Sequence, residues 1–96
     1  MRKTTEQAVS AFMSGRNHKN SNTEVITHAN NVSYMYLHGN HIAIKDKNTI
    51  MICLAGWNTN TTRDRLNGIP NVHLSTKKGQ AILNGNPIGN YEWVII

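Results

Sequence analysis

Apolar residues recur at helical spacing near the start of the chain and with a period of two after residue 23. Before the helical stripe, Thr4 and Gln7 fit a capping box, and Gly15 after it is a typical helix-ending residue. These signals predict an N-terminal helix, followed by a polar loop over residues 16–22. The stripe consists of Ala8, Val9, Phe12 and Met13.

The period of two predicts a series of antiparallel strands. Residues 32–38 and 41–45 alternate on both sides of Gly39-Asn40, which fits a two-residue hairpin turn. Residues 49–55 are apolar on both faces, so we expect this strand to lie centrally in the sheet. The expected strands are 23–28, 32–38, 41–45, 49–55, 71–76, 80–84 and 91–96.

A segment rich in Thr and Asn separates the central strand from the last hairpin. Asn60 or Thr61 can cap a short helix that ends before Gly68. We therefore predict one α+β domain over residues 1–96. It would contain an antiparallel sheet of about five to six strands, an N-terminal helix and one short internal helix.

The charge of the chain favours anionic partners. Its 96 residues include 10 Lys and Arg against 5 Asp and Glu, a formal net charge of +5. Such an excess suits nucleic acid, nucleotides or an acidic protein surface. The alternative is ordinary solubility charge, because the basic residues form no long block.

Cysteine usage points to a reducing compartment. Cys53 is the single cysteine, whereas a secreted domain of this size usually carries several disulfides. It lies in an apolar run, which favours a buried thiol over a nucleophile. The sequence shows neither a signal segment nor an apolar stretch of membrane-spanning length. We expect a cytoplasmic protein with no membrane contact.

No catalytic pattern is visible in the sequence. The 5 acidic residues are scattered, and neither a Gly-rich phosphate loop nor a nucleophile elbow occurs. His38 and His41 could form half a metal site with His28 or His73, but no zinc-binding motif accompanies them. We predict no enzyme, no metal and no cofactor.

The predicted hairpin suggests a first contact surface. Pairing across Gly39-Asn40 would place Tyr34 opposite Lys45 and put Tyr36 on the same sheet face. Rings beside cations are suited to single-stranded nucleic acid, with rings to stack bases and cations to meet phosphates. The alternative is that both tyrosines pack beneath a helix. The opposite face would hold Met35, Leu37, Ile42 and Ile44.

The start of the internal helix suggests a second surface. Free N–H groups, hydroxyls and the positive helix end could hold a phosphate, with arginines nearby. The alternatives are that the threonines only cap the helix, that an acidic neighbour neutralises the arginines, and that the tryptophan is a core anchor, which we favour. The residues concerned are Trp57, Thr61, Thr62, Arg63 and Arg65.

Two stretches resemble small proteins of tailed bacteriophages. They are Tyr-Leu-His-Gly-Asn-His-Ile-Ala at 36–43 and Ala-Gly-Trp-Asn-Thr-Asn-Thr-Thr-Arg-Asp-Arg-Leu-Asn at 55–67, and the Leu-Asn-Gly at 83–85 and Trp93 are also similar. The resemblance covers most of the chain and supplies no catalytic residues. It implies a compact viral accessory protein made in the cytoplasm of the host bacterium. Such proteins commonly bind host enzymes, nucleic acid or defence signals.

The leading hypothesis is a non-enzymatic bacteriophage accessory protein that binds a phosphate-bearing partner, either nucleic acid or a nucleotide signal. The alternative is an inhibitor of a host protein, such as an anti-defence factor, anchored by an exposed sheet edge or by Trp57. A third hypothesis is a small virion component. A free edge over residues 91–96 would also allow a homodimer.

Overall fold

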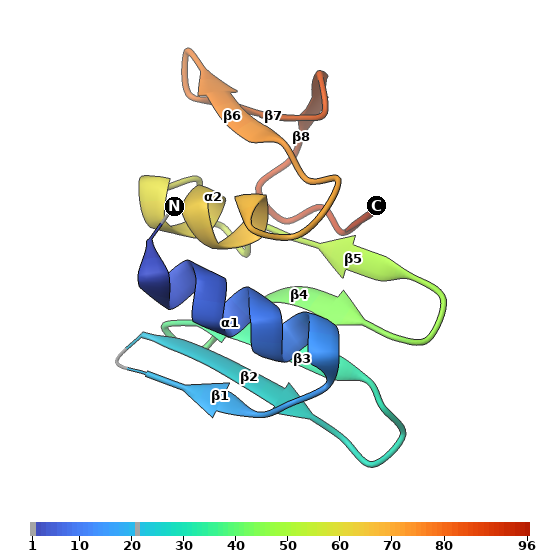
Figure 1. The fold of residues 1–96 in the computed structure, drawn as a ribbon. Coiled ribbons are helices and arrows are strands. Elements are labelled where there is room, and N and C mark those ends of the chain that lie inside the picture. Colours follow the sequence, from blue (N-terminus) through green and yellow to red (C-terminus); the bar gives the residue numbers. More distant parts are fainter. Residues whose placement is uncertain (1, 21) are drawn as a thin grey trace.

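The computed structural model describes residues 2–20 and 22–96, which form two helices and nine strands (Figure 1). The helices are α1 (Lys3–Ser14) and α2 (Asn60–Asn67). The strands are β1 (His18–Lys19), β2 (Thr23–Thr27), β3 (Ser33–Leu37), β4 (Asn40–Lys45), β5 (Ile50–Ile52), β6 (Leu74–Lys77), β7 (Gln80–Leu83), β8 (Asn86–Ile88) and β9 (Val94–Ile95).

The strands form two antiparallel sheets. The larger has six strands in the order β1-β2-β3-β4-β5-β9, and the smaller has three in the order β6-β7-β8. The predicted α+β class with its two helices is therefore confirmed. The strand β5 lies between β4 and β9, as its apolar sequence indicated. The last predicted hairpin does not join the main sheet; its strands β6 and β7 pair with each other, and β7 also pairs with β8.

The helix α1 begins two residues earlier than the capping box at Thr4 predicted. Its N-cap is Arg2, whose side chain makes no capping bond, and the N–H of Glu6 donates to the Arg2 carbonyl over 3.1 Å. The predicted capping box at Thr4 and Gln7 is therefore wrong, because Thr4 already lies inside the first turn. Gly15 ends the helix as expected, with a left-handed φ of 72°.

Part of the predicted loop at residues 16–22 is a strand. In β1, His18 lies opposite Val25 and Lys19 lies opposite Glu24 of β2. Backbone pairing along an open strand edge needs no apolar side-chain pattern, which explains why the polar sequence gave no sign of β1.

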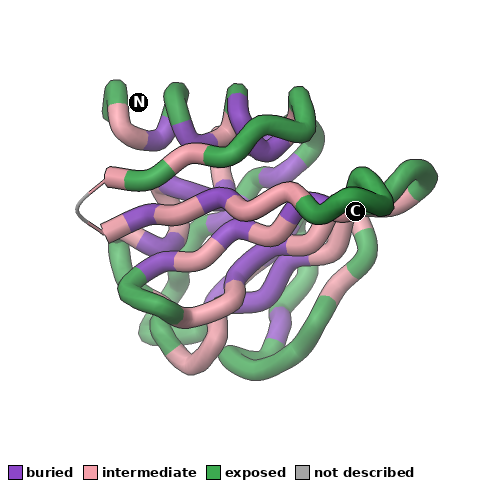
Figure 2. Tube along the Cα trace, turned by 90° about the horizontal axis from the view of Figure 1, so that it is seen from below, coloured by how far each residue is buried: buried purple, intermediate pink, exposed green. Residues whose placement is uncertain are grey.

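One face of the six-stranded sheet, which we call the inner face, packs against both helices. α1 contacts β1, β2 and β3, and α2 contacts α1 and β4. Figure 2 shows α1 on one side of the sheet, with buried and half-buried positions alternating along the strands. The small sheet contributes to the same apolar core. No helix in the described residues is long and apolar enough to cross a membrane.

The turn between β3 and β4 lies at His38 and Gly39, one residue before the predicted position. Both residues have positive φ angles, 50° and 78°, as a type I′ turn requires. A bulge then leaves Ile42 unpaired, so that Ile42 and Ala43 are both buried. The predicted register of this hairpin is therefore wrong.

The corrected register changes which side chains share a face. Ile44, predicted in the core, lies opposite Tyr34. Lys45, predicted beside the tyrosines, lies opposite Ser33, which is buried on the inner face. Directly opposed residues point to the same side of a sheet, so Lys45 and Tyr34 lie on opposite sides.

Candidate functional site

The segment before α2 is shaped by a glycine and a threonine. Gly56 has a φ of 85°, a conformation that disfavours other residues, and a Cβ there would approach the Tyr91 hydroxyl to 2.6 Å. Thr59 is the N-cap, and its hydroxyl accepts from the N–H of Thr62 over 3.2 Å. The predicted cap at Asn60 or Thr61 is therefore wrong, because the helix begins one residue after Thr59.

A cavity of about 490 Å³ lies between the start of α2 and the β3–β4 hairpin. Apolar residues contribute to its lining, three threonines come from α2 and the residue before it, and Trp57 is 56% exposed. The preferred assignment of Trp57 to the core is therefore wrong. The lining residues are Leu37, His38, Asn40, Ile42, Leu54, Trp57, Thr59, Thr61 and Thr62.

Two arginines lie beside this cavity. Arg63 donates to the side-chain carbonyls of Asn58 and of Asn60, the latter over 2.5 Å, so its guanidinium is fixed near the helix start. Arg2 donates to the hydroxyl of Thr61 over 3.4 Å. Among the described residues that line the cavity, none carries a carboxylate. The electrostatic character of this region is therefore positive.

Arg65 lies inside the fold, where it makes hydrogen bonds to other elements. It is 2% exposed and donates to the hydroxyls of Thr23 over 2.9 Å and Thr5 over 2.7 Å. It also forms an ion pair with Asp64 at 3.2 Å. Burial lowers the pKa of the Arg65 guanidinium, and the Asp64 charge opposes that shift. The prediction that Arg65 contacts a ligand is wrong: its donors join α1, β2 and α2.

The outer side of the six-stranded sheet carries a cluster of aromatic side chains. Tyr34 and Tyr36 are half-buried there, and α1 covers the opposite side, so the alternative that both pack beneath a helix is wrong. We call this side the aromatic face. Its residues are Ile26, Tyr34, Tyr36, His41, Ile44, Met51, Trp93 and Ile95.

The rings of this face contact one another. His41 stacks on Tyr36 with ring centroids 4.9 Å apart, and it meets Trp93 edge-on at 5.1 Å. Tyr34 lies 4.9 Å from His41 and 6.5 Å from Tyr36. Burial lowers the pKa of His41, and a hydrogen bond with the Ala43 backbone partly opposes this shift. The ring cluster is therefore packed and partly dehydrated.

The structure separates the eight predicted contact residues into four groups, of which Lys45, opposite Ser33 on the inner side of the sheet, forms one by itself. Trp57, Thr61 and Thr62 line the cavity, with Arg63 beside it. Tyr34 and Tyr36 share the aromatic face, without Lys45. Arg65 is internal. The predicted contacts therefore include three of the nine residues that line the cavity, and the tyrosines, Lys45 and Arg65 lie elsewhere.

Sequence reasoning missed the hairpin residues of the cavity and the last ring of the aromatic face. His38 and Asn40 reach the cavity from the β3–β4 turn, whose correct position was signalled by the His-Gly pair. Trp93 reaches His41 because β9 follows β5 at the sheet edge. That long-range pairing has no local sequence signal.

A family model described as Kyanoviridae Gp96 protein matches residues 1–95. The chain belongs to this family. Kyanoviridae Gp96 is a family of tailed cyanophage proteins, so the phage resemblance of the sequence is confirmed. No curated protein and no solved structure matches the chain. The family therefore identifies a small phage protein and assigns no activity to it.

Proposed function

We propose that this phage protein is a non-enzymatic module that binds a phosphate-bearing partner, a nucleotide or a nucleic-acid end, in the cavity at the start of α2. The observation that carries the proposal is the combination in one cavity of an exposed indole, hydroxyls at a helix start and adjoining arginines. The volume of about 490 Å³ is in the range of small-molecule sites.

Each part of the cavity suits one part of a nucleotide. The Trp57 ring, which is more than half exposed, offers a surface on which a base can stack. Thr61 and the helix start offer a hydroxyl and a positive dipole end to a phosphate. Arg63 adds a fixed cation whose guanidinium geometry suits phosphate oxygens.

The cavity is a better phosphate site than the aromatic face. Cations lie beside the cavity, whereas the corrected register removes Lys45 from the tyrosines. A nucleic-acid strand draws most of its affinity from cations at its phosphates, so rings alone are insufficient. The proposal therefore restricts the phosphate contacts to the region of Trp57, Thr61 and Arg63, since Thr62 is 1% exposed and its hydroxyl lies 3.0 Å from that of Thr59.

Tryptophan fluorescence can test this proposal directly. The chain has 2 tryptophans, so Trp93→Phe leaves Trp57 as the single reporter. We expect saturable quenching of Trp57 by at least one of AMP, GTP, a cyclic dinucleotide or a dT8 oligonucleotide. Affinity should fall with salt, most strongly for the oligonucleotide. If none of these probes at about 1 mM changes the emission, the proposal is abandoned.

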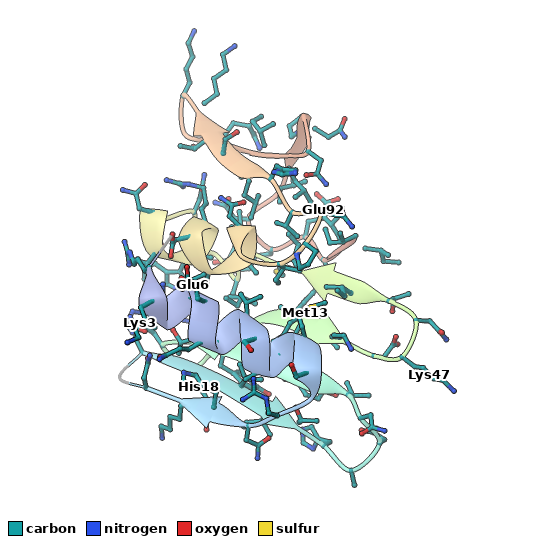
Figure 3. The ribbon with its side chains drawn as sticks, in the orientation of Figure 1. Lys3, Glu6, Met13, His18, Lys47 and Glu92 are labelled. Carbon is teal, nitrogen blue, oxygen red and sulfur yellow. The ribbon has the colours of Figure 1, made fainter. Side chains whose placement is uncertain are left out.

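A matched pair of charge removals locates the phosphate contact. Arg63→Gln should weaken binding by about tenfold, as the loss of one charge-assisted hydrogen bond predicts. Lys47→Gln removes the same charge from the β4–β5 loop, far from α2 in Figure 3, and should leave affinity nearly unchanged. Equal effects of the two variants would indicate general charge attraction and no defined phosphate contact.

Inhibition of a host protein is the second candidate function, because Trp57 projects from the molecule beside an apolar cavity. A tryptophan that becomes buried against a partner protein is a typical hot-spot anchor of an interface. A pull-down from nuclease-treated bacterial lysate distinguishes the two functions. One stoichiometric host protein, lost with Trp57→Ala, would support inhibition; co-purifying nucleotide, identified by mass spectrometry, would support the first proposal.

A further inference from the structure

We propose that the aromatic face is an interface between two copies of this chain, which associate sheet to sheet. This inference does not depend on the nucleotide proposal, because the cavity lies at the β3–β4 turn and the helix side of the sheet. A sheet covered by helices on one face alone leaves its other face to water or to a partner. The composition of that face decides which partner it fits.

On the aromatic face, residues paired across neighbouring strands form a row of uncharged side chains. One row of directly paired residues on this side runs from β2 to β9 and is uncharged throughout, and Ile95 at the end of the row is 64% exposed. A continuous apolar row across five strands is unusual for a sheet face in water. The row consists of Ile26, Tyr34, Ile44, Met51 and Ile95.

The neighbouring row carries charges of both signs at one end. Lys19 lies opposite Glu24, and Glu24 lies opposite Tyr36, whose next partner is His41. One positive and one negative residue leave this rim without net charge. Nucleic acid needs an excess of cations, so it fits this face poorly.

A second copy fits the same face well. Each chain carries a formal charge of +5, so two copies repel each other except where an uncharged surface is presented. The uncharged row of the aromatic face is such a surface, with Glu24 and Lys19 at its rim, and a two-fold axis would place it against itself. Two sheets packed face to face, about 10 Å apart, would bury both sets of rings between two layers of helices.

The dimensions of the face predict a weak dimer. The five strands that carry the face, from β2 to β9, are spaced by about 4.8 Å, and β2 and β3 are 5 residues long, which gives a footprint of roughly 19 by 16 Å. This is smaller than the roughly 800 Å² per partner of a standard stable interface. We therefore expect a dissociation constant of about 1–100 µM, typical of small interfaces.

Sedimentation equilibrium on the full chain, from about 1 µM to about 1 mM, tests the proposal. We expect a monomer–dimer equilibrium. Ile95→Lys places a charge on the face at a position that is 64% exposed, and should raise the dissociation constant at least tenfold. Trp57→Lys is the matched control, because it alters a residue that is 56% exposed at the cavity, and should leave the constant unchanged.

Tryptophan emission gives an independent readout on the native face. In Trp57→Phe, Trp93 is the single tryptophan, and its emission should shift to shorter wavelength over the same concentration range as dimerisation. A chain that stays monomeric at about 1 mM overturns the proposal. So do equal effects of Ile95→Lys and Trp57→Lys, or a Trp93 shift that needs added dT8 oligonucleotide or a host protein.

Discussion

The two faces of the six-stranded sheet use the same strands for different chemistry. The inner face contributes fully buried side chains such as Met35 and Ile52 to the core beneath the helices, together with the buried Thr23, whose hydroxyl accepts from Arg65. The aromatic face carries half-buried rings and aliphatic residues, with Trp93 and Ile95 more exposed at its edge. The inner face holds the chain together, whereas the aromatic face is available for contact.

The contrast shows that apolar composition does not identify the core of this protein. Both faces are rich in large uncharged side chains, and what separates them is the helix layer on one side. The core beneath the inner face also contains polar groups. Arg65 of α2 donates hydrogen bonds to the hydroxyls of Thr5 in α1 and Thr23 in β2, so these buried groups have partners. Burial of a polar residue is tolerated there since its hydrogen bonds are made within the fold.

A methionine-to-alanine substitution on each face of the sheet should give the largest difference in the free energy of unfolding. Met35→Ala removes a side chain that is 0% exposed in the core and should lower the free energy of unfolding by about 3 kcal/mol. Met51→Ala, on the half-buried aromatic face, should cost about 1 kcal/mol or less. Urea unfolding at low micromolar concentration measures both. Equal losses would mean that the aromatic face is part of the core.

Replacing each of the two arginines of α2 should give a smaller difference in stability. Arg65→Gln breaks the buried bonds to Thr5 and Thr23 and should lower stability by about 2 kcal/mol. Arg63→Gln, in the same helix, removes an arginine bonded to surface asparagines and should change stability by less than about 0.5 kcal/mol. Thermal unfolding compares them. A larger loss for Arg63 would contradict the assignment of structural and binding roles.

The smallest effect is a pH dependence on the aromatic face. His41 has its pKa lowered from 6.5 by burial among the rings, so the unfolded chain takes up a proton at a higher pH than the folded chain. His41 therefore leaves stability unchanged well above pH 6.5 and reduces it as the pH falls between the unfolded and folded pKa values. Urea titrations of the wild type and His41→Gln at pH 8 and pH 5 isolate the contribution of His41 to the pH dependence of stability. An equal pH dependence in both would contradict it.

Several parts of the fold follow from local sequence. The N-terminal helix, its end at Gly15, the central position of β5 and the β6–β7 hairpin were all predicted, because periodicity and turn residues act over a few positions. The hairpin register failed by one residue at His38 and Gly39, and the bulge at Ile42 was not anticipated. The shifted turn alone would keep Lys45 on the side of Tyr34, because it moves the pairing by two residues. The single extra residue of the bulge exchanges the faces and places Lys45 on the other side.

The types of element, the positive charge and the phage family resemblance follow from residue identity and short-range spacing. The internal position of Arg65, the place of Trp57 beside a cavity and the contact of Trp93 with His41 became known from the folded chain. Those placements depend on contacts between segments far apart in the chain. Local patterns cannot specify such contacts, because each segment finds its burial and its hydrogen-bond partners only when the whole chain packs.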